Sequence, residues 1–390
     1  MAVSKRIKKY NIGITGIMPE IKAAALKESP FRFYRGTCHL FVEDFVKLYN
    51  YKPKVKTWIC GDIHFENAGA YKGDDRQIYF DINDFDEAVL ASPEPELCRF
   101  LTSIIIAAGQ MQATSINLNK ALYDLMDIYT ETMQGRKAKM LNANVAEGDI
   151  KLFFSQMSTI DRNDFIAHHT IKGDGNLLLI KTDNVHYFPM DKKDKAALFE
   201  QLGPILNTQK RFAEMVFEDA AIRVAGTGSL GLDRFGVLFF SKKKGKHYMI
   251  DIKQTRLSCY GEIIGIKQPR FKNDAARIIE TGYLMQYAPP DFMASFKAGN
   301  KLFIVKELQP KADKMSIDYF KKDFVKLVRV AKEIAKLIAY AQLRSSGNLG
   351  ASNIDELVKF TAKSQWQKDI IDVSATLADQ NNKYYKAFLK

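Results

Sequence analysis

The pattern of apolar and polar positions in the first third of the chain predicts a helix, a short strand and a β-hairpin. Phe41, Phe45 and Leu48 recur at helical spacing and predict a helix. The segment TWICGD at 57–62 predicts a short buried strand that ends in a turn. The alternating residues at 69–84 predict a β-hairpin with the turn KGDD.

A long apolar helix is predicted after this hairpin. Ser92 is the expected N-cap, and Pro93 stands in the first turn. The run FLTSIIIAAG within this helix is expected to be buried in the core. Further along, the residues at 175–190 predict two strands around the turn TDN, and 192–207 predict a helix.

Beyond about residue 220 the pattern becomes that of β-structure. Three strands are predicted there, joined by a glycine-rich turn and by the basic turn KKKGK. A helix is expected at 273–287, with Asn273 or Asp274 as its cap, and the segment KLFIVKEL predicts another strand. From residue 313 onward the pattern is helical, interrupted by RSSGNLGASN. The predicted fold class is therefore α+β.

Composition narrows the class of protein. The 390 residues are enough for two lobes, and the formal charge of +13 favours acidic partners such as phosphorylated ligands. The basic runs are short, so each is expected to be a solvated tail or hairpin tip, and nucleic acid is not the expected partner. Four cysteines without framework spacing predict free thiols and a cytoplasmic location. We find no signal-peptide pattern and no apolar run long enough to span a membrane.

One glycine-rich motif, GTGSLG, runs from Gly226 to Gly231. A dinucleotide-binding glycine motif leads into a helix, whereas here a strand is predicted to follow and the next strand carries Lys253. This is the arrangement of the kinase nucleotide lobe, in which backbone amides cover phosphates and the lysine pairs with them. A glycine-rich hairpin with an exposed lysine is the alternative. Glu280 is the preferred carboxylate partner of Lys253, and Glu262 is the next candidate.

Two acidic motifs lie far upstream of the glycine motif. In GDIHFEN, Asp62 and Asn67 have the spacing of the kinase catalytic loop, D-x-x-x-x-N, in which the aspartate accepts the hydroxyl proton and the asparagine holds a metal ion. In NDFDEA, Asp84 is the expected Mg²⁺ ligand, Asp81 is its competitor and Asp86 could assist. The alternatives are that Asp62 caps its own turn and that Asp84 pairs with a lysine.

Zinc binding is a rival interpretation of the same region. Cys60 and His64, together with Cys38 and His39, could supply four ligands. The spacing is not that of structural zinc sites, which use two closely spaced pairs, so this interpretation ranks below the magnesium site. Arg35 is expected to contact a phosphate or carboxylate, or else to form a salt bridge.

A family resemblance accounts for several ordered segments together. The segments are SPFRFYRGT, WICGDIHFENAGAY, FDINDFDEA, RVAGTGSLG, IKQT, RIIETGYLMQ and AYAQLRSSG…LADQNNKYYKAF. They resemble a bacterial family catalogued as a domain of unknown function and related to protein-kinase-like and aminoglycoside-type phosphotransferases. In kinases the glycine loop precedes the catalytic loop, whereas here it follows. The resemblance therefore implies a two-lobed, kinase-like fold that is circularly permuted.

The resemblance also implies an activity and a set of site residues. We expect an ATP- and Mg²⁺-dependent phosphotransferase that acts on a hydroxyl-bearing small molecule. His64 fills the place of the catalytic-loop residue near the transferred phosphate. The implied residues are Asp62, His64, Lys253 and Glu280 for catalysis; Gly226, Thr227, Gly228, Ser229, Gly231, Lys253, Glu307 and Leu308 for nucleotide; and Asn67, Asp84 and Asp81 for metal.

This assignment divides the chain into five segments. They are a basic N-terminal segment (1–30), a helical-lobe part with the catalytic and metal loops (31–145), a connecting region (146–215), a β-rich nucleotide lobe (216–311) and a C-terminal helical-lobe part (312–390). Two other functions stay open. One is a nucleotide-binding regulatory protein that is catalytically silent or transfers AMP. The other is a basic nucleic-acid-binding protein.

Overall fold

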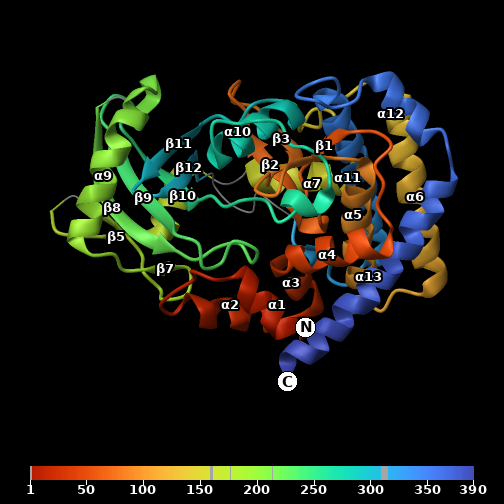
Figure 1. Cartoon of the computed structure of the whole chain (residues 1–390). Helices are drawn as coiled ribbons and strands as arrows, with labels where there is room; N and C mark the ends of the chain where they lie inside the picture. The colour runs from red at the N-terminus through yellow and green to blue at the C-terminus, as the bar shows by residue number, and fades with distance from the viewer. Residues whose placement is uncertain (1, 159–160, 176, 213, 309–314) are drawn as a thin grey trace.

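A computed structural model describes residues 2–158, 161–175, 177–212, 214–308 and 315–390. The molecule has a β-rich half and a helical half, which lie side by side in Figure 1. Both halves contribute to the region between them, where the acidic and glycine motifs meet. The predicted mixture of helix and sheet, α+β, is confirmed.

The β-rich half is built on one antiparallel sheet with the strand order β11-β12-β10-β9-β8-β7. Its strands are β7 (Tyr187–Phe188), β8 (Met215–Arg223), β9 (Arg234–Ser241), β10 (Lys246–Gln254), β11 (Met293–Ala298) and β12 (Lys301–Glu307). Helix α9 (Lys192–Asn207) covers one face, because Leu198, Leu202 and Leu206 pack with apolar side chains of the central strands. Helix α8 (Arg162–His169) packs against β10.

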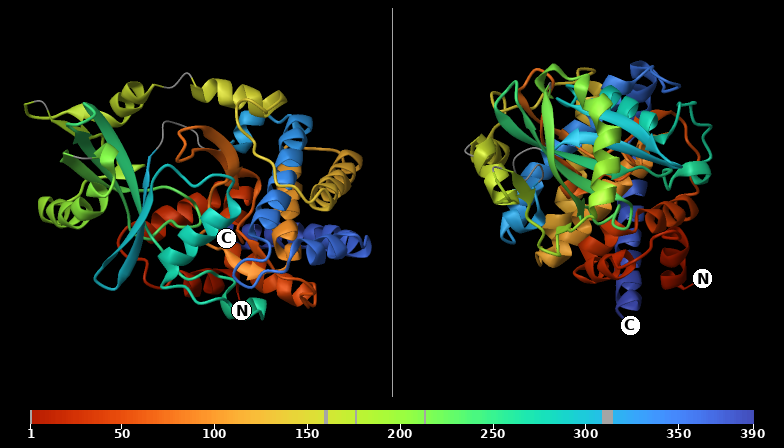
Figure 2. Two further views of the ribbon diagram at one scale, coloured as in Figure 1. Left: turned by 90° about the horizontal axis from the view of Figure 1, so that it is seen from above. Right: turned by 90° about the vertical axis from the view of Figure 1, so that its left-hand side faces the viewer.

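The helical half surrounds the acidic motifs. Strand β1 (Thr57–Ile59) pairs with β4 (Val89–Ala91), and β2 (Ala68–Lys72) forms a hairpin with β3 (Ile78–Ile82). Helices pack around these strands (Figure 2), and their apolar side chains form one large core. They are α5 (Pro93–Gln110), α6 (Ser115–Gln134), α11 (Phe324–Ser345), α12 (Ile354–Thr361) and α13 (Gln365–Leu389).

The N-terminal helices lie along the lower side of the molecule in Figure 1. They are α1 (Val3–Tyr10), α2 (Met18–Lys27), α3 (Pro30–Gly36) and α4 (Cys38–Leu48). Helix α1 contacts α13, and Arg6 Nη1 donates a 2.7 Å hydrogen bond to the Tyr384 hydroxyl. The two ends of the chain therefore lie side by side.

One of the remaining elements connects the two halves. Helix α10 (Asp274–Met285) contacts α11 as well as β11 and β12, so it links the sheet to the helical half. The others are α7 (Gly148–Ser158), β5 (Thr170–Lys172), β6 (Leu178–Ile180), and the 3₁₀ turns η1 (Phe65–Asn67), η2 (Lys210–Phe212), η3 (Gly261–Ile264) and η4 (Ile317–Phe320). Within the described residues, we find no helix that combines the length and the apolar character needed to cross a membrane.

Most sequence-predicted elements are confirmed, including the hairpin at β2–β3, the buried helix α5 and the Asn273 cap, whose side chain accepts from the N–H of Ala276. The two strands predicted around TDN are present as β6 and β7, and each pairs with another strand: β6 pairs with β5, and β7 joins β8. One prediction was wrong. Residues 5–9 are not a solvated tail, because they lie in α1, where Arg6 forms ion pairs with Glu43 and Asp44.

Candidate functional site

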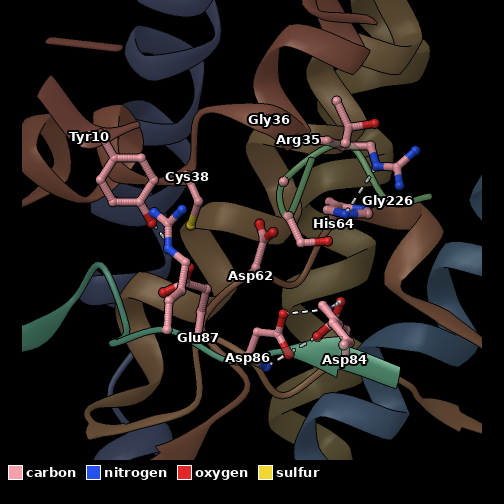
Figure 3. A pocket seen from close by; sticks show the side chains of 15 residues that line it. Tyr10, Arg35, Gly36, Cys38, Asp62, His64, Asp84, Asp86, Glu87 and Gly226 are labelled. Atoms are coloured by element: carbon pink, nitrogen blue, oxygen red, sulfur yellow. Dashed lines mark hydrogen bonds and ion pairs between the residues drawn. The ribbon is translucent and has the colours of Figure 1, made fainter. Parts of the chain in front are cut away.

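One cavity, which we call the site cavity, lies between the glycine loop at 225–232 and the acidic segment at 83–87. Its empty volume is about 630 Å³, counting the part that is open to solvent. Figure 3 shows its walls, with Asp62 between the side of Tyr10 and Glu87 and the side of His64 and Arg35. The lining residues are Tyr10, Arg35, Gly36, Cys38, Asp62, His64, Asp84, Asp86, Glu87, Gly226, Thr227, Gly228, Ser229, Lys253 and Arg256.

The glycine loop joins β8 to β9 and adopts a backbone that favours glycine at both ends. Gly226 has φ +77° and Gly231 has φ +97°, which disfavour side chains with a Cβ. Arg234 Nη1 donates a 2.9 Å hydrogen bond to the carbonyl of Ala225 and so holds the start of the loop. Among the backbone hydrogen bonds of the described residues, none uses the N–H groups of Thr227 and Gly228. These groups are available to an anion in the cavity.

Helices α2 and α3 hold the glycine loop from its outer side. Lys22 Nζ donates to the carbonyl of Gly228 at 3.0 Å, and Arg32 Nη1 donates to Thr227 Oγ1 at 3.1 Å. A Cβ at Gly36 would lie 3.1 Å from the Thr227 methyl group, so a larger residue there would crowd the loop. The expected loop residues 226–229 line the site cavity, whereas Gly231 lines a neighbouring cavity.

Lys253, on β10, lies against the acidic segment. Its Nζ is 3.7 Å from Asp84 Oδ2 and forms a closer ion pair with Asp86. Burial alone would lower the pKa of Lys253, but the two carboxylates raise it above its ordinary value. Burial alone would likewise raise the pKa of Asp84, and Lys253 and Lys306 hold it below its ordinary value. The strand lysine and the acidic motif therefore meet, although they lie far apart in the chain.

Asp62 lies at the bottom of the cavity and is held by Arg99. Arg99 Nε and Nη2 both donate to Asp62 Oδ1, at 2.9 and 2.7 Å. The Arg99 guanidinium is fully buried and stacks 3.7 Å from the Tyr34 ring, so its position is fixed. Burial raises the pKa of Asp62 above its ordinary value, although the Arg99 ion pair opposes this shift.

His64 and Arg35 form the opposite wall. Arg35 Nε donates to His64 Nε2 at 3.3 Å, and Arg35 Nη1 forms an ion pair with Glu66. Burial lowers the pKa of Arg35 despite the nearby Glu66. The salt bridge that the sequence left open for Arg35 is therefore present, while Arg35 still lines the cavity.

Asn67 and Asp81 lie behind the cavity instead of lining it. Asn67 Nδ2 donates to the backbone carbonyl of Asp62 at 2.9 Å, which braces the loop. Asp81 is buried, pairs with Arg344 at 2.9 Å and accepts from the N–H of Tyr287 at 3.1 Å. Of the two aspartates that the sequence proposed as metal ligands, only Asp84 reaches the cavity.

The expected pairing of Lys253 with Glu280 is not found. Glu280 is exposed on α10, because the buried positions of that helix, such as Ala275 and Ile278, lie on another face. Lys253 pairs instead with Asp84 and Asp86. The side chain of Glu262, the other candidate, lies outside the described residues.

Helix α10 does reach the acidic segment, but through Arg277. Arg277 Nη1 donates to the carbonyl of Ala88 at 2.7 Å, and its Nη2 donates to the carbonyl of Asp86 at 2.9 Å. This contact fixes the backbone that carries Asp84 and Asp86, so the helix positions the acidic segment without touching the cavity.

Glu307 and Leu308 line a second cavity of about 750 Å³ at the end of β12. This cavity and the site cavity lie on the two sides of the acidic segment. Asn83 and Phe85 line the second cavity, whereas Asp84, Asp86 and Glu87 line the site cavity. Its wall also contains a buried ion pair between Arg234 and Asp251, with closest atoms 2.7 Å apart.

Several cavity residues were missed from the sequence. Tyr10 and Arg256 belong to none of the motifs proposed for the site, and Cys38 was considered only as a zinc ligand. Glu87 lies within NDFDEA, directly after Asp86, so its place in the acidic motif was a usable signal. Burial raises the pKa of Glu87 to about 7, opposed by the hydrogen bond that its carboxylate accepts from the N–H of Cys259.

The donor set suits a metal that needs few protein ligands. In the part of the chain that the structure describes, no three His, Cys, Asp or Glu side chains are arranged as a metal-binding group. The Asp84 side chain is 48% exposed and faces the cavity beside Asp86, which is 23% exposed. Mg²⁺ is commonly held by one or two carboxylates together with substrate phosphates and water, so this pair fits Mg²⁺. The four cysteines are buried free thiols, as predicted.

Comparison with known proteins identifies the family. The family model described as "Uncharacterized protein conserved in bacteria (DUF2252)" matches residues 18–390. The chain therefore belongs to this bacterial family, which confirms that part of the sequence-based expectation. No curated protein and no solved structure matches the chain. The comparisons give no support for a relationship to kinases.

Proposed function

We propose that the protein is an ATP- and Mg²⁺-dependent phosphotransferase with a two-lobed, kinase-like, circularly permuted arrangement. One observation carries the proposal. The glycine loop, Lys253, Asp84 and Asp62 line a single cavity, although they come from two distant parts of the chain. Phosphoryl transfer depends mainly on positioning and on neutralising charge, and this set of groups supplies both.

The order of elements supports the kinase-like arrangement. Strand, glycine loop, strand, lysine-bearing strand, helix and two strands follow one another from β8 to β12. Strand, GDIHFEN loop, hairpin and acidic segment follow one another from β1 to residue 87. These two series correspond to the nucleotide lobe and the catalytic segment of kinases, in reversed order along the chain.

The neighbours of β1 support the permutation. Helix α11 contacts both β1 and β3, and the N–H of Ser352 donates to the carbonyl of Lys56 at 2.7 Å. The segment after α11 therefore lies beside the start of β1, where an unpermuted chain would run from the helix into the strand. The neighbouring chain ends make such a rearrangement sterically feasible.

Asp62 is the proposed general base. Both of its hydrogen bonds to Arg99 use Oδ1, so Oδ2 remains for the acceptor's proton. The acceptor oxygen would form a bond to the γ-phosphorus, its proton would pass to Asp62, and the bond between that phosphorus and the ADP oxygen would break. The raised pKa of Asp62 favours proton uptake more than an ordinary aspartate would.

The remaining residues would hold the nucleotide. Lys253 and the N–H groups of Thr227 and Gly228 would bind the phosphates, with Lys253 moving from Asp86 towards them. Asp84 and Asp86 would hold Mg²⁺, which neutralises phosphate charge when it is bound. The adenine ring of the nucleotide would lie in the second cavity near Leu308, on the far side of the acidic segment.

The walls of the cavity favour a small acceptor. Arg35, Gly36 and Cys38 from α3 and α4, with Tyr10 from α1, close the side next to Asp62. An extended polypeptide would have to displace these helices. They are held together by a common buried cluster that includes Leu26, Phe33 and Leu40. We therefore propose a hydroxylated small molecule as the acceptor.

Substitution of Asp62 tests the proposal. Asp62→Asn is expected to lower the rate of phosphate transfer by about 10²–10⁴-fold, the range for loss of a general base. Binding of Mg²⁺-ATP, measured by calorimetry, should stay close to wild type. Glu280→Gln, which changes an exposed acid outside the cavity, is the control and should leave both unchanged. Mass spectrometry of the products formed from ATP and a metabolite mixture would measure the transfer. Equal phosphate transfer by wild type and Asp62→Asn would refute the role of Asp62. Products that carry AMP would show nucleotidyl transfer in place of phosphate transfer.

A further inference from the structure

Arg256 stands at the edge of the site cavity in a fixed orientation. Its guanidinium carbon lies 3.7 Å from the centre of the Tyr10 ring. The His39 ring stacks on the same tyrosine at 3.9 Å, with an angle of 14° between the planes. Two groups at these distances cannot share one face of the ring, so Arg256, Tyr10 and His39 form a three-layer stack. The stack restricts the guanidinium before any ligand binds.

Arg256 differs from the other cations that line the cavity. Arg35 pairs with Glu66, and Lys253 pairs with Asp84 and Asp86. Among the ion pairs of the described residues, none involves Arg256. Burial lowers its pKa to about 10, so the guanidinium is charged at neutral pH but poorly hydrated. A desolvated cation without an anion is unfavourable, and an anionic ligand would relieve that cost.

A neighbouring cavity provides space for such a ligand. Tyr10, Ser229 and Arg256 line both the site cavity and this third cavity, whose empty volume is about 1130 Å³. The third cavity opens between residues 11–18 and the glycine loop, away from Glu307 and Leu308, where the nucleotide base is placed. A molecule that enters here would reach Arg256 on its way towards Asp62.

We propose that Arg256 binds an anionic group, a carboxylate or a phosphate, on the acceptor whose hydroxyl faces Asp62. This inference rests on the proposed function and narrows its substrate class to hydroxylated acids or phosphate esters. The planar guanidinium presents paired N–H donors that match either group in a bidentate arrangement. The triphosphate has Lys253 and the glycine loop as its own partners, so Arg256 remains for the second substrate.

Calorimetry with three matched probes tests this inference. The protein is first saturated with Mg²⁺ and AMP-PNP, and is then titrated with glycerol 3-phosphate, glycerate or neutral glycerol. We expect one or both anions to bind, with the stronger one identifying phosphate or carboxylate, and glycerol to bind far more weakly. Arg256→Met should weaken anion binding by about tenfold to a hundredfold, as for loss of charge-assisted hydrogen bonds.

Two further variants keep the test decisive. Arg270→Met removes an exposed arginine from the same connection after β10 and should bind the anions as wild type does. Arg256→Lys keeps the charge but loses the planar donor pair, so it should bind the anions more weakly than wild type. This variant replaces Arg256→Met if the methionine variant does not fold.

The inference is overturned if glycerol binds as well as the anions, if no anion binds, or if Arg256 variants bind the anions as tightly as wild type does. Loss of AMP-PNP binding in the Arg256 variants would overturn it too, while absence of AMP-PNP binding in wild type would refute the proposed function itself.

Discussion

The carboxylates at 81–87 show that residues of one chemical type take different roles in different surroundings. Asp81 is buried against Arg344 and accepts backbone N–H groups, so its role is structural. Asp84 faces the cavity and shares Lys253 with Asp86. Glu87 accepts from the N–H of Cys259 and lies towards Tyr10. Only contacts between distant segments distinguish these roles.

Substitution of Asp84 should therefore weaken nucleotide binding, whereas substitution of Asp81 should destabilise the fold. Asp84→Asn should weaken Mg²⁺-nucleotide binding by about tenfold or more, because a metal ligand and a lysine partner are lost. Asp84→Asn should change the free energy of unfolding little, because Lys253 keeps its ion pair with Asp86. Asp81→Asn should destabilise the fold by about 3–5 kcal/mol, because Arg344 is left buried without its counter-ion. Urea denaturation and nucleotide titration measure the two effects, and the reverse pattern would make Asp81 the ligand.

Glu87 should impose a pH dependence on stability. Its pKa is raised from 4.5 to about 7 by burial, so the folded state holds this proton more tightly than the unfolded state does. The resulting stabilisation is complete below pH 4.5 and is lost as the pH rises through 7. Glu87→Gln keeps an acceptor for the N–H of Cys259 and should reduce this loss by on the order of 2 kcal/mol. Urea denaturation at pH 4.5 and pH 8 measures the free energy of unfolding of both proteins. If this free energy differs between the two pH values by the same amount in wild type and in Glu87→Gln, the assignment is contradicted.

At the scale of elements, the glycine loop depends on helices that are remote in sequence. Lys22 on α2 donates to the carbonyl of Gly228, and Arg32 on α3 donates to Thr227. Arg234 at the start of β9 holds Ala225 from the other end. A loop held at several points can present its N–H groups to phosphate with little loss of conformational freedom on binding.

Removal of the Lys22 contact tests this bracing. Lys22→Met should lower the backbone order parameters of residues 226–230, from about 0.85 for a rigid backbone towards about 0.6, because the hydrogen bond to the Gly228 carbonyl is lost. Lys27→Met removes an exposed lysine from the same helix and should leave these order parameters unchanged. NMR relaxation of the backbone amides makes the comparison. Equal order parameters in wild type and Lys22→Met would show that α2 does not restrain the loop.

Much of the site could be predicted because its motifs are local. GDIHFEN, NDFDEA and GTGSLG each combine a turn with a short strand, so Asp62, Asp84 and the glycine loop could be identified from spacing. The predicted role of Glu280 was wrong: it has apolar neighbours in the sequence, but its own side chain is exposed. Helical periodicity through Ala275 and Ile278 would have placed Glu280 on the outer face.

Other parts could not be predicted from local pattern. Tyr10 and Arg256 reach the cavity, and Arg99 reaches Asp62, through tertiary contacts that no motif indicates. Strand β11 was not predicted; it depends on pairing with β12, so its own sequence carries a weak signal.

At the scale of the whole molecule, the site depends on the meeting of a β-rich and a helical half. The acidic segment belongs to the helical half, and the glycine loop and Lys253 belong to the sheet. Helix α10 contacts both halves, and α2 and α3 hold the glycine loop through Lys22 and Arg32. The proposed kinase-like site requires these contacts and does not require a particular order of the segments along the chain.

A crystal structure with Mg²⁺ and AMP-PNP tests the central claim most directly. The account predicts the triphosphate in the site cavity, beneath Thr227 and Gly228, with Lys253 moved from Asp86 to the phosphates and Asp84 on the metal. A nucleotide bound elsewhere, or a triphosphate that contacts neither Lys253 nor Asp84, would contradict it.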